Sequence, residues 1–100
     1  MEANSVFLNN KDNVITASVD IKTGENAYYF KNMECVEILV TEDVRAYHKI
    51  ALEDINISEI VVKYGESIGK ATKKIKKGGL VDHTNINSIP RDYQNEMVRC

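Results

Sequence analysis

The fold is decided by HKIALEDINISEIVVKYGESIGKATKKIKKGGLVDHTNI, residues 48–86 of this 100-residue chain. Short apolar runs alternate here with small turn residues, which predicts one uninterrupted compact β unit. The stretch also repeats a phrase: a charged residue, Ile, two further residues, a small residue at a turn, and an extended run. Copies of this phrase begin at Asp20, Asp54 and Lys74. The recurrence identifies the chain more sharply than any catalytic motif does.

Strand signals dominate the rest of the chain. Alternating or continuous apolar residues predict strands at 12–20, 35–40, 59–64, 67–72 and 80–84. The run 35–40 is almost continuously apolar, which predicts burial on both of its faces. No window of helical length has a clean 3.6-residue apolar stripe, so we expect at most one or two short helical turns, at 44–47 and after Pro90. The predicted fold class is mainly β, with short strands joined by tight turns.

Composition limits the possible functions. With 43% hydrophobic residues and a net charge of −2, the chain is expected to form one domain with a modest single core. The near-balanced charge does not favour a nucleic-acid partner. The apolar residues 6–8 are followed at once by polar ones, so neither a signal-peptide core nor a membrane span is expected, and the cytoplasm is the expected compartment. Cys35 and Cys100 are expected to be free thiols.

Two lysine-containing segments are candidates for binding. Five lysines within residues 70–77 can attract an anionic substrate or an acidic partner, or can form an ordinary solvated strand and turn. The sequence KYGESIG at 63–69 lacks the spacing of a phosphate-binding P-loop. Lys63 and Tyr64 can instead supply polar groups to a shared pocket. Alternatively, Lys63 faces water and the Tyr64 ring packs against the fold.

The segment Asp82-His83-Thr84-Asn85 combines a carboxylate, an imidazole, a hydroxyl and an amide in four residues. In an extended strand these side chains alternate between faces, so all four converge only if the backbone bends. Two interpretations stay open, namely a binding site and a set of hydrogen bonds that closes a turn. A self-contained zinc site is not expected, because the chain has no His-x-x-x-His or Cys-x-x-Cys arrangement.

Three phrases together carry a family resemblance: YHKIAL at 47–52, KYGESIG at 63–69 and GGLVDHTN at 78–85. In this order they resemble the SAF domain, a β-clip fold, of the altronate and galactarate dehydratase family. The family phrases read Gly-His-Lys-apolar-Ala-Leu, Lys-Tyr-Gly-x-x-Ile-Gly and Gly-x-x-Val-His-x-His-Asn. The resemblance implies a SAF domain over residues 11–86, preceded by a segment 1–10 and followed by a tail or docking arm 87–100. Here Tyr47 replaces a glycine, and Asp82 and Thr84 stand where the family has two histidines.

The resemblance also implies a function. Because the sequence ends soon after Asn85, we expect a small subunit that docks on a separate large catalytic subunit of a sugar-acid dehydratase, such as altronate dehydratase. The expected chemistry is removal of the proton α to a carboxylate, with a divalent metal, iron or manganese, held mainly by the large subunit. Alternatives are the small subunit of a sulfolactate sulfo-lyase and a non-catalytic β-clip module for binding or scaffolding. A homo-oligomer is also open.

The same resemblance assigns residues to a site at the subunit junction. Substrate binding is expected at His48, Lys63, Tyr64 and Asn85, and metal binding at Asp82 and His83. No catalytic residue is expected within this chain alone. A carboxylate and a hydroxyl at 82 and 84 can supply oxygen ligands to a hard cation, but they cannot replace imidazole as acid–base groups near neutral pH.

Overall fold

The computed structural model describes residues 2–88, which form nine strands and no helix. All strand pairs are antiparallel. A central sheet has the order β1-β2-β5-β8, from strands Ser5–Val6, Val14–Ala17, Lys49–Ala51 and Leu80–Val81. A two-stranded ribbon pairs β3 (Asn26–Lys31) with β4 (Glu34–Leu39), and a third sheet has the order β6-β7-β9, from Ile60–Lys63, Glu66–Ala71 and Ile86–Ser88. The prediction of a mainly β fold is confirmed.

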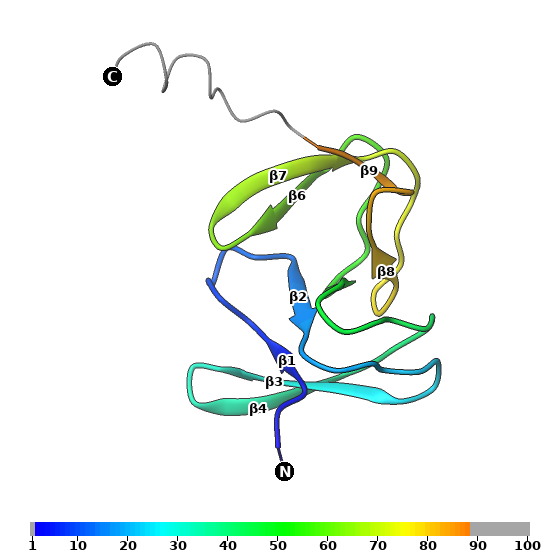
Figure 1. Cartoon of the computed structure of the whole chain (residues 1–100). Helices are drawn as coiled ribbons and strands as arrows, with labels where there is room; N and C mark the ends of the chain where they lie inside the picture. Colours follow the sequence, from blue (N-terminus) through cyan, green and yellow to red (C-terminus); the bar gives the residue numbers. More distant parts are fainter. Residues whose placement is uncertain (1, 89–100) are drawn as a thin grey trace, which may run out of the picture.

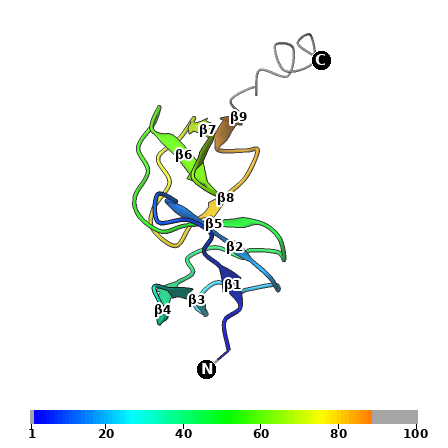
Figure 2. The ribbon, with the colours of Figure 1, turned by 90° about the vertical axis from the view of Figure 1, so that its left-hand side faces the viewer.

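The central sheet lies between the other two layers (Figures 1 and 2). In both views the β3–β4 ribbon lies below it and the β6–β7–β9 sheet above it. The strands β5 and β8 from the stretch 48–86 complete this sheet by pairing beside β2 from the N-terminal part. The alternating pattern predicted that residues 48–86 form one uninterrupted unit by themselves. This prediction is wrong, because β5 and β8 belong to a sheet whose other two strands lie outside the stretch.

The repeated turn phrase occurs four times, not three. The fourth copy begins at Asp43 and has Tyr47 at the turn position. In every copy the N–H of the sixth residue donates to the carbonyl of the third. The fifth residue has a φ between 72° and 88°, which is the geometry of a type II turn and favours glycine. The sequence pattern missed the fourth copy because Tyr47 is not small. These fifth residues are Gly24, Tyr47, Ser58 and Gly78.

The four copies pair two by two through isolated bridges. Ile21 pairs with Val44, and Ile55 pairs with Ile75. Two backbone hydrogen bonds of 2.7–2.8 Å close each bridge. The molecule thus has two similar halves, each made of two paired turns with a hairpin between them. Residues 44–47, a candidate helical turn, form a bridge and a type II turn, while the candidate after Pro90 lies outside the described residues.

Aspartates stabilise the paired turns from the opposite copy. The first residue of one copy accepts a hydrogen bond from the backbone N–H of the fourth residue of its partner. The copy that begins at Lys74 is the exception, because a lysine side chain has no carboxylate to accept such a bond. The three bonds are Asp20 Oδ1 with Ala46 N–H (2.8 Å), Asp43 Oδ1 with Thr23 N–H (2.9 Å) and Asp54 Oδ1 with Lys77 N–H (2.9 Å).

The core consists of two clusters, one on each side of the central sheet, and not of the predicted single core. Neighbouring residues of one strand point to opposite faces, so Val14 and Ile15 belong to different clusters, as do Ile50 and Ala51. Because the central sheet is covered on both faces, apolar residues occur at neighbouring positions of its short strands. The cluster toward the ribbon contains Ile15, Ala17, Ile21, Ala27, Tyr29, Ile38, Val40, Val44 and Ile50, and the other contains Val14, Ala51, Ile55, Val61, Ala71, Ile75 and Val81.

Two strand predictions need correction. Residues 35–40 are not buried on both faces, because the ribbon packs by one face only: Ile38 is buried whereas Cys35, Glu37 and Leu39 are exposed. The strand expected at 80–84 ends at Val81, where the chain bends into a turn. Segment 1–10 contributes β1 to the central sheet.

Candidate functional site

Polar residues from distant parts of the chain meet at one edge of the central sheet. In β5, Lys49 pairs with Val81 of β8 on one side and with Thr16 of β2 on the other. Directly opposite residues of antiparallel strands are close neighbours on the same face of a sheet. His48 directly precedes β5 and Asp82 directly follows β8, so the antiparallel pairing of these strands brings the two predicted residues to the same edge.

Lys63 reaches this edge from the third sheet. The Asn13 side chain, at the start of β2, accepts the N–H of Val62 at 2.8 Å and donates to the carbonyl of Ile60 at 2.9 Å. These bonds hold β6 over β2. Lys63, the last residue of β6, thereby lines a pocket together with Thr16, the cross-strand partner of Lys49.

The pKa shifts show that these charges interact. Burial lowers the pKa of the Lys49 ammonium, the nearby charge of Lys63 lowers it further, and Asp82 partly opposes the shift. We call His48, Lys49, Lys63, Asp82 and His83 the Lys49 cluster. Its central member, Lys49, was missed by sequence reasoning. The only signal for it was its place beside His48 in the phrase YHKIAL.

The Asp82 carboxyl has a lowered pKa of its own. The main cause is a hydrogen bond from the Thr84 hydroxyl, supported by the Thr84 N–H and by the charges of His83 and His48, while desolvation acts in the opposite direction. The ring of His48 is exposed, and its Nδ1 lies 3.3 Å from the carbonyl oxygen of Ala46. When Nδ1 carries the proton, this contact orients the ring and leaves Nε2 available to a ligand.

Residues 82–85 form a turn that is closed by their own side chains. Asp82 Oδ1 accepts the Thr84 N–H at 2.9 Å and the Thr84 hydroxyl at 2.5 Å. Asn85 Oδ1 accepts the Asp82 N–H at 2.9 Å, and Asn85 Nδ2 donates to the carbonyl of Leu80 at 2.7 Å. The backbone therefore bends as a shared site would require, but the oxygen atoms of Thr84 and Asn85 are used to close the turn.

A metal ion would find few ligands on this chain. Within residues 2–88, no three His, Cys, Asp or Glu side chains converge in a way that could hold one. Asp82 and His83 are consecutive residues. Together they can supply two ligands, the Asp82 Oδ2 atom and one ring nitrogen of His83. A metal at this edge would need its other ligands from a partner.

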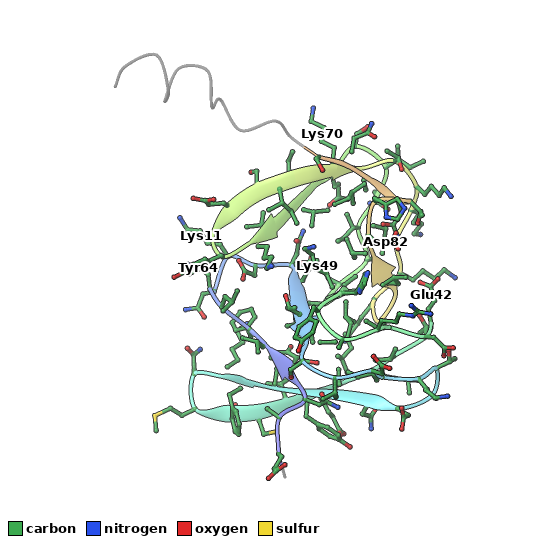
Figure 3. All side chains as sticks on the ribbon, viewed as in Figure 1. Lys11, Glu42, Lys49, Tyr64, Lys70 and Asp82 are labelled. Atoms are coloured by element: carbon green, nitrogen blue, oxygen red, sulfur yellow. The ribbon has the colours of Figure 1, made fainter. Side chains whose placement is uncertain are left out.

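Tyr64 lies away from the Lys49 cluster. Tyr64 and Gly65 both have positive φ and form the two-residue turn between β6 and β7, with Tyr64 70% exposed. Asp12, only 8% exposed, accepts the N–H of Gly65 at 2.8 Å and anchors this turn. Figure 3 shows Tyr64 and Asp82 on opposite sides of the molecule, with Lys49 between them.

Asn85 belongs to a second, polar pocket of about 400 Å³. Three members of the lysine-rich segment line it, together with Glu42, whose Oε2 accepts the N–H of Leu80 at 2.8 Å. All five lysines of that segment are exposed, as a solvated strand and turn requires. The three lysines in the pocket are Lys73, Lys74 and Lys76.

Comparison with known proteins adds two findings. Residues 3–89 match the family model described as the altronate/galactarate dehydratase SAF domain. The chain is also 35% identical over 89 residues to altronate dehydratase of Bacillus subtilis (strain 168), an alignment that covers 89% of this chain and 17% of that protein. The chain thus spans less than a fifth of this relative. Residues 2–88 contain no helix that is long and apolar enough to span a membrane.

Proposed function

The chain belongs to the altronate/galactarate dehydratase SAF-domain family, as its three phrases predicted, and from this membership we propose that it is the SAF portion of a sugar-acid dehydratase. In this proposal it is a small subunit that acts in the cytoplasm with a separate large catalytic subunit. The observation that carries the proposal is the Lys49 cluster, in which two lysines, two histidines and an aspartate from three strands and their ends gather at one place on the domain.

The proposed reaction is the loss of water from a hexonate such as altronate. The C–H bond α to the carboxylate breaks and its proton passes to a base, then the hydroxyl on the neighbouring carbon leaves with its bonding electrons and a proton. The ammonium groups of Lys49 and Lys63 receive anionic groups at the junction, the substrate carboxylate among them, and the exposed His48 ring adds a hydrogen bond to the substrate. Lys49 suits this role because burial and the charge of Lys63 disfavour its ammonium, so an incoming carboxylate restores favourable electrostatics.

A divalent metal, iron or manganese, would polarise the substrate carboxylate and make the α proton easier to remove. The large subunit would hold most of its ligands, and Asp82 and His83 are the residues of this chain that can add to them. Thr84 and the backbone orient the Asp82 carboxylate. Tyr64 and Asn85 act in the fold of the domain, through the β6–β7 turn and the turn at 82–85.

A second candidate is the small subunit of a sulfolactate sulfo-lyase. It is favoured by the pairing of two lysines from different sheets, because sulfolactate carries two anionic groups. Assays on altronate, galactarate and sulfolactate with the assembled chains separate the two candidates.

The test compares turnover by the large chain with and without this chain. We expect activity only in the complex. Lys49→Gln should raise KM by about 10- to 150-fold, since a hydrogen bond to a charged group contributes about 1.5–3 kcal/mol. The control Lys76→Gln, at an exposed lysine outside the cluster, should leave KM within twofold. A large chain that is fully active and stable alone would overturn the proposal.

A further inference from the structure

An apolar pocket borders the Lys49 cluster, and of its lining residues only Lys63 takes part in the proposed chemistry. It has a volume of about 270 Å³ and is lined by residues in or next to β1 and β2, by the turn copy that begins at Asp43 and by the end of β6. Val6 is 44% exposed, Leu8 43% and Tyr47 79%, so three large apolar side chains around one hollow face water. The complete lining is Val6, Leu8, Thr16, Ala17, Ser18, Tyr47 and Lys63.

Tyr47 is held in an unfavourable backbone conformation. Its φ is 73°, whereas the corresponding position of two other turn copies is glycine. A non-glycine residue in the left-handed region costs about 1–2 kcal/mol. Because the ring is so exposed, packing within this chain recovers little of that cost. Backbone strain of this kind is kept where surrounding structure or function requires it, and here the ring borders a pocket.

The pocket has one cationic end. Lys63 lies in its wall, and the charge of Lys63 acts on Lys49 next to Thr16. A carboxylate bound beside Lys63 would relieve the repulsion between the two ammonium groups. The opposite walls, Val6 and Leu8, offer no hydrogen bonds to a polyhydroxylated sugar acid. The volume lies just below the range of about 300–1,000 Å³ that is typical of small-molecule sites, and it suits one large side chain.

We propose that this pocket is the docking site for the large catalytic subunit, which inserts an apolar side chain between Leu8 and Tyr47 and places a carboxylate on Lys63. The inference rests on the proposed function and divides the roles of the cluster: Lys63 pairs with the partner protein, whereas Lys49 and His48 remain for the substrate. Docking here closes the open edge of the Lys49 cluster, because Thr16 joins the pocket to Lys49.

The test measures the dissociation constant of the complex between this chain and the large chain. Tyr47→Gly removes the ring and also relieves the positive φ, so the variant should keep its fold and not lose melting temperature. We expect it to weaken association at least tenfold, and Leu8→Ser to do the same. Lys63→Gln should weaken association and reduce its dependence on salt. Lys49→Gln should leave association unchanged while it raises KM.

Met33→Gly is the matched control. Met33 is 98% exposed with a φ of 66° at the tip of the β3–β4 ribbon, so this change also removes an exposed apolar side chain from a left-handed residue. Its association should stay within twofold of wild type. If the wild-type complex forms and Tyr47→Gly binds equally well, the docking inference is wrong while the proposed function stands. If wild-type chains do not associate, both are wrong. Loss of self-association by Tyr47→Gly, with unchanged binding to the large chain, would assign the pocket to a second copy and overturn the inference.

Discussion

Replacing glycine by alanine at two equivalent turn positions separates backbone strain from lack of space. Gly24 and Gly78 are the fifth residues of two turn copies, and their φ values are 88° and 86°. A Cβ added at Gly24 meets no atom within 4 Å, whereas one added at Gly78 collides with the carbonyl oxygen of Leu39. Both substitutions therefore carry the cost of placing alanine at positive φ. Only the one at Gly78 adds a steric collision.

The magnitudes follow from these two terms. Alanine in the left-handed region costs about 1–2 kcal/mol, and the stiffer unfolded chain returns about 0.4–1 kcal/mol, so Gly24→Ala should lower the free energy of unfolding by about 1 kcal/mol. At Gly78 the colliding atom belongs to the backbone, where Thr41 N–H also donates to the Gly78 carbonyl at 3.0 Å. Such overpacking adds about 1–3 kcal/mol, for a total loss of about 2–4 kcal/mol at Gly78. This is a large part of the 5–15 kcal/mol that is typical of a domain.

Urea unfolding followed by far-ultraviolet circular dichroism measures both losses, provided that the slope m is unchanged. Equal losses at the two positions would refute the reasoning, because they would mean that positive φ alone decides the cost. A larger loss at Gly24 would contradict the assignment of open space around that residue.

Three further predictions concern charged positions. Lys74→Asp should raise stability by about 0.5–1 kcal/mol, because the new carboxylate can accept the Ile57 N–H as Asp54 accepts that of Lys77; a lower melting temperature would contradict the equivalence of the four copies. Lys49→Met should stabilise the isolated chain at neutral pH by removing a poorly solvated charge. The pKa of Lys49 is lower in the folded than in the unfolded chain, so the unfolded chain binds more protons at alkaline pH. The free energy of unfolding of the wild type should therefore rise as pH rises through the folded pKa, and the stability advantage of Lys49→Met should shrink. An advantage that stays constant up to pH 11 would oppose this account. Asp82→Ala should cost about 1 kcal/mol at pH 7 through loss of the turn bonds. Because the pKa of Asp82 is lowered in the fold, its carboxylate stabilises the fold above the unfolded pKa, and this stabilisation is lost as pH falls through the folded pKa. Thermal melts at pH 7 and pH 2.5 should therefore show a smaller loss of stability for Asp82→Ala in acid.

The candidate site was predictable only in part. His48, Lys63, Asp82 and His83 could be named because they stand in phrases that resemble a known family. Their meeting at one edge depends on pairing between strands that are more than thirty residues apart, such as Lys49 with Val81. Propensity and periodicity report neighbours along the chain and contain no information on such pairing. For the same reason Lys49 was missed, and the sequence pattern did not reveal that Tyr64 lies in the β6–β7 turn or that the Asn85 side chain closes the turn at 82–85.

The sequence by itself determined the β class and three of the four turns, because apolar alternation and small turn residues set the local backbone conformation. It also determined the family, through the three matched phrases. Only the tertiary structure decided that Tyr47 adopts a turn conformation that its residue type disfavours. Two hydrogen bonds to distant parts of the sequence hold this turn. The Tyr47 N–H donates to the Ala17 carbonyl, and the Ala46 N–H donates to the Asp20 carboxylate. Tertiary contacts likewise decided that the stretch 48–86 is divided between two sheets, since burial of both faces of the central sheet required strands from both halves of the chain.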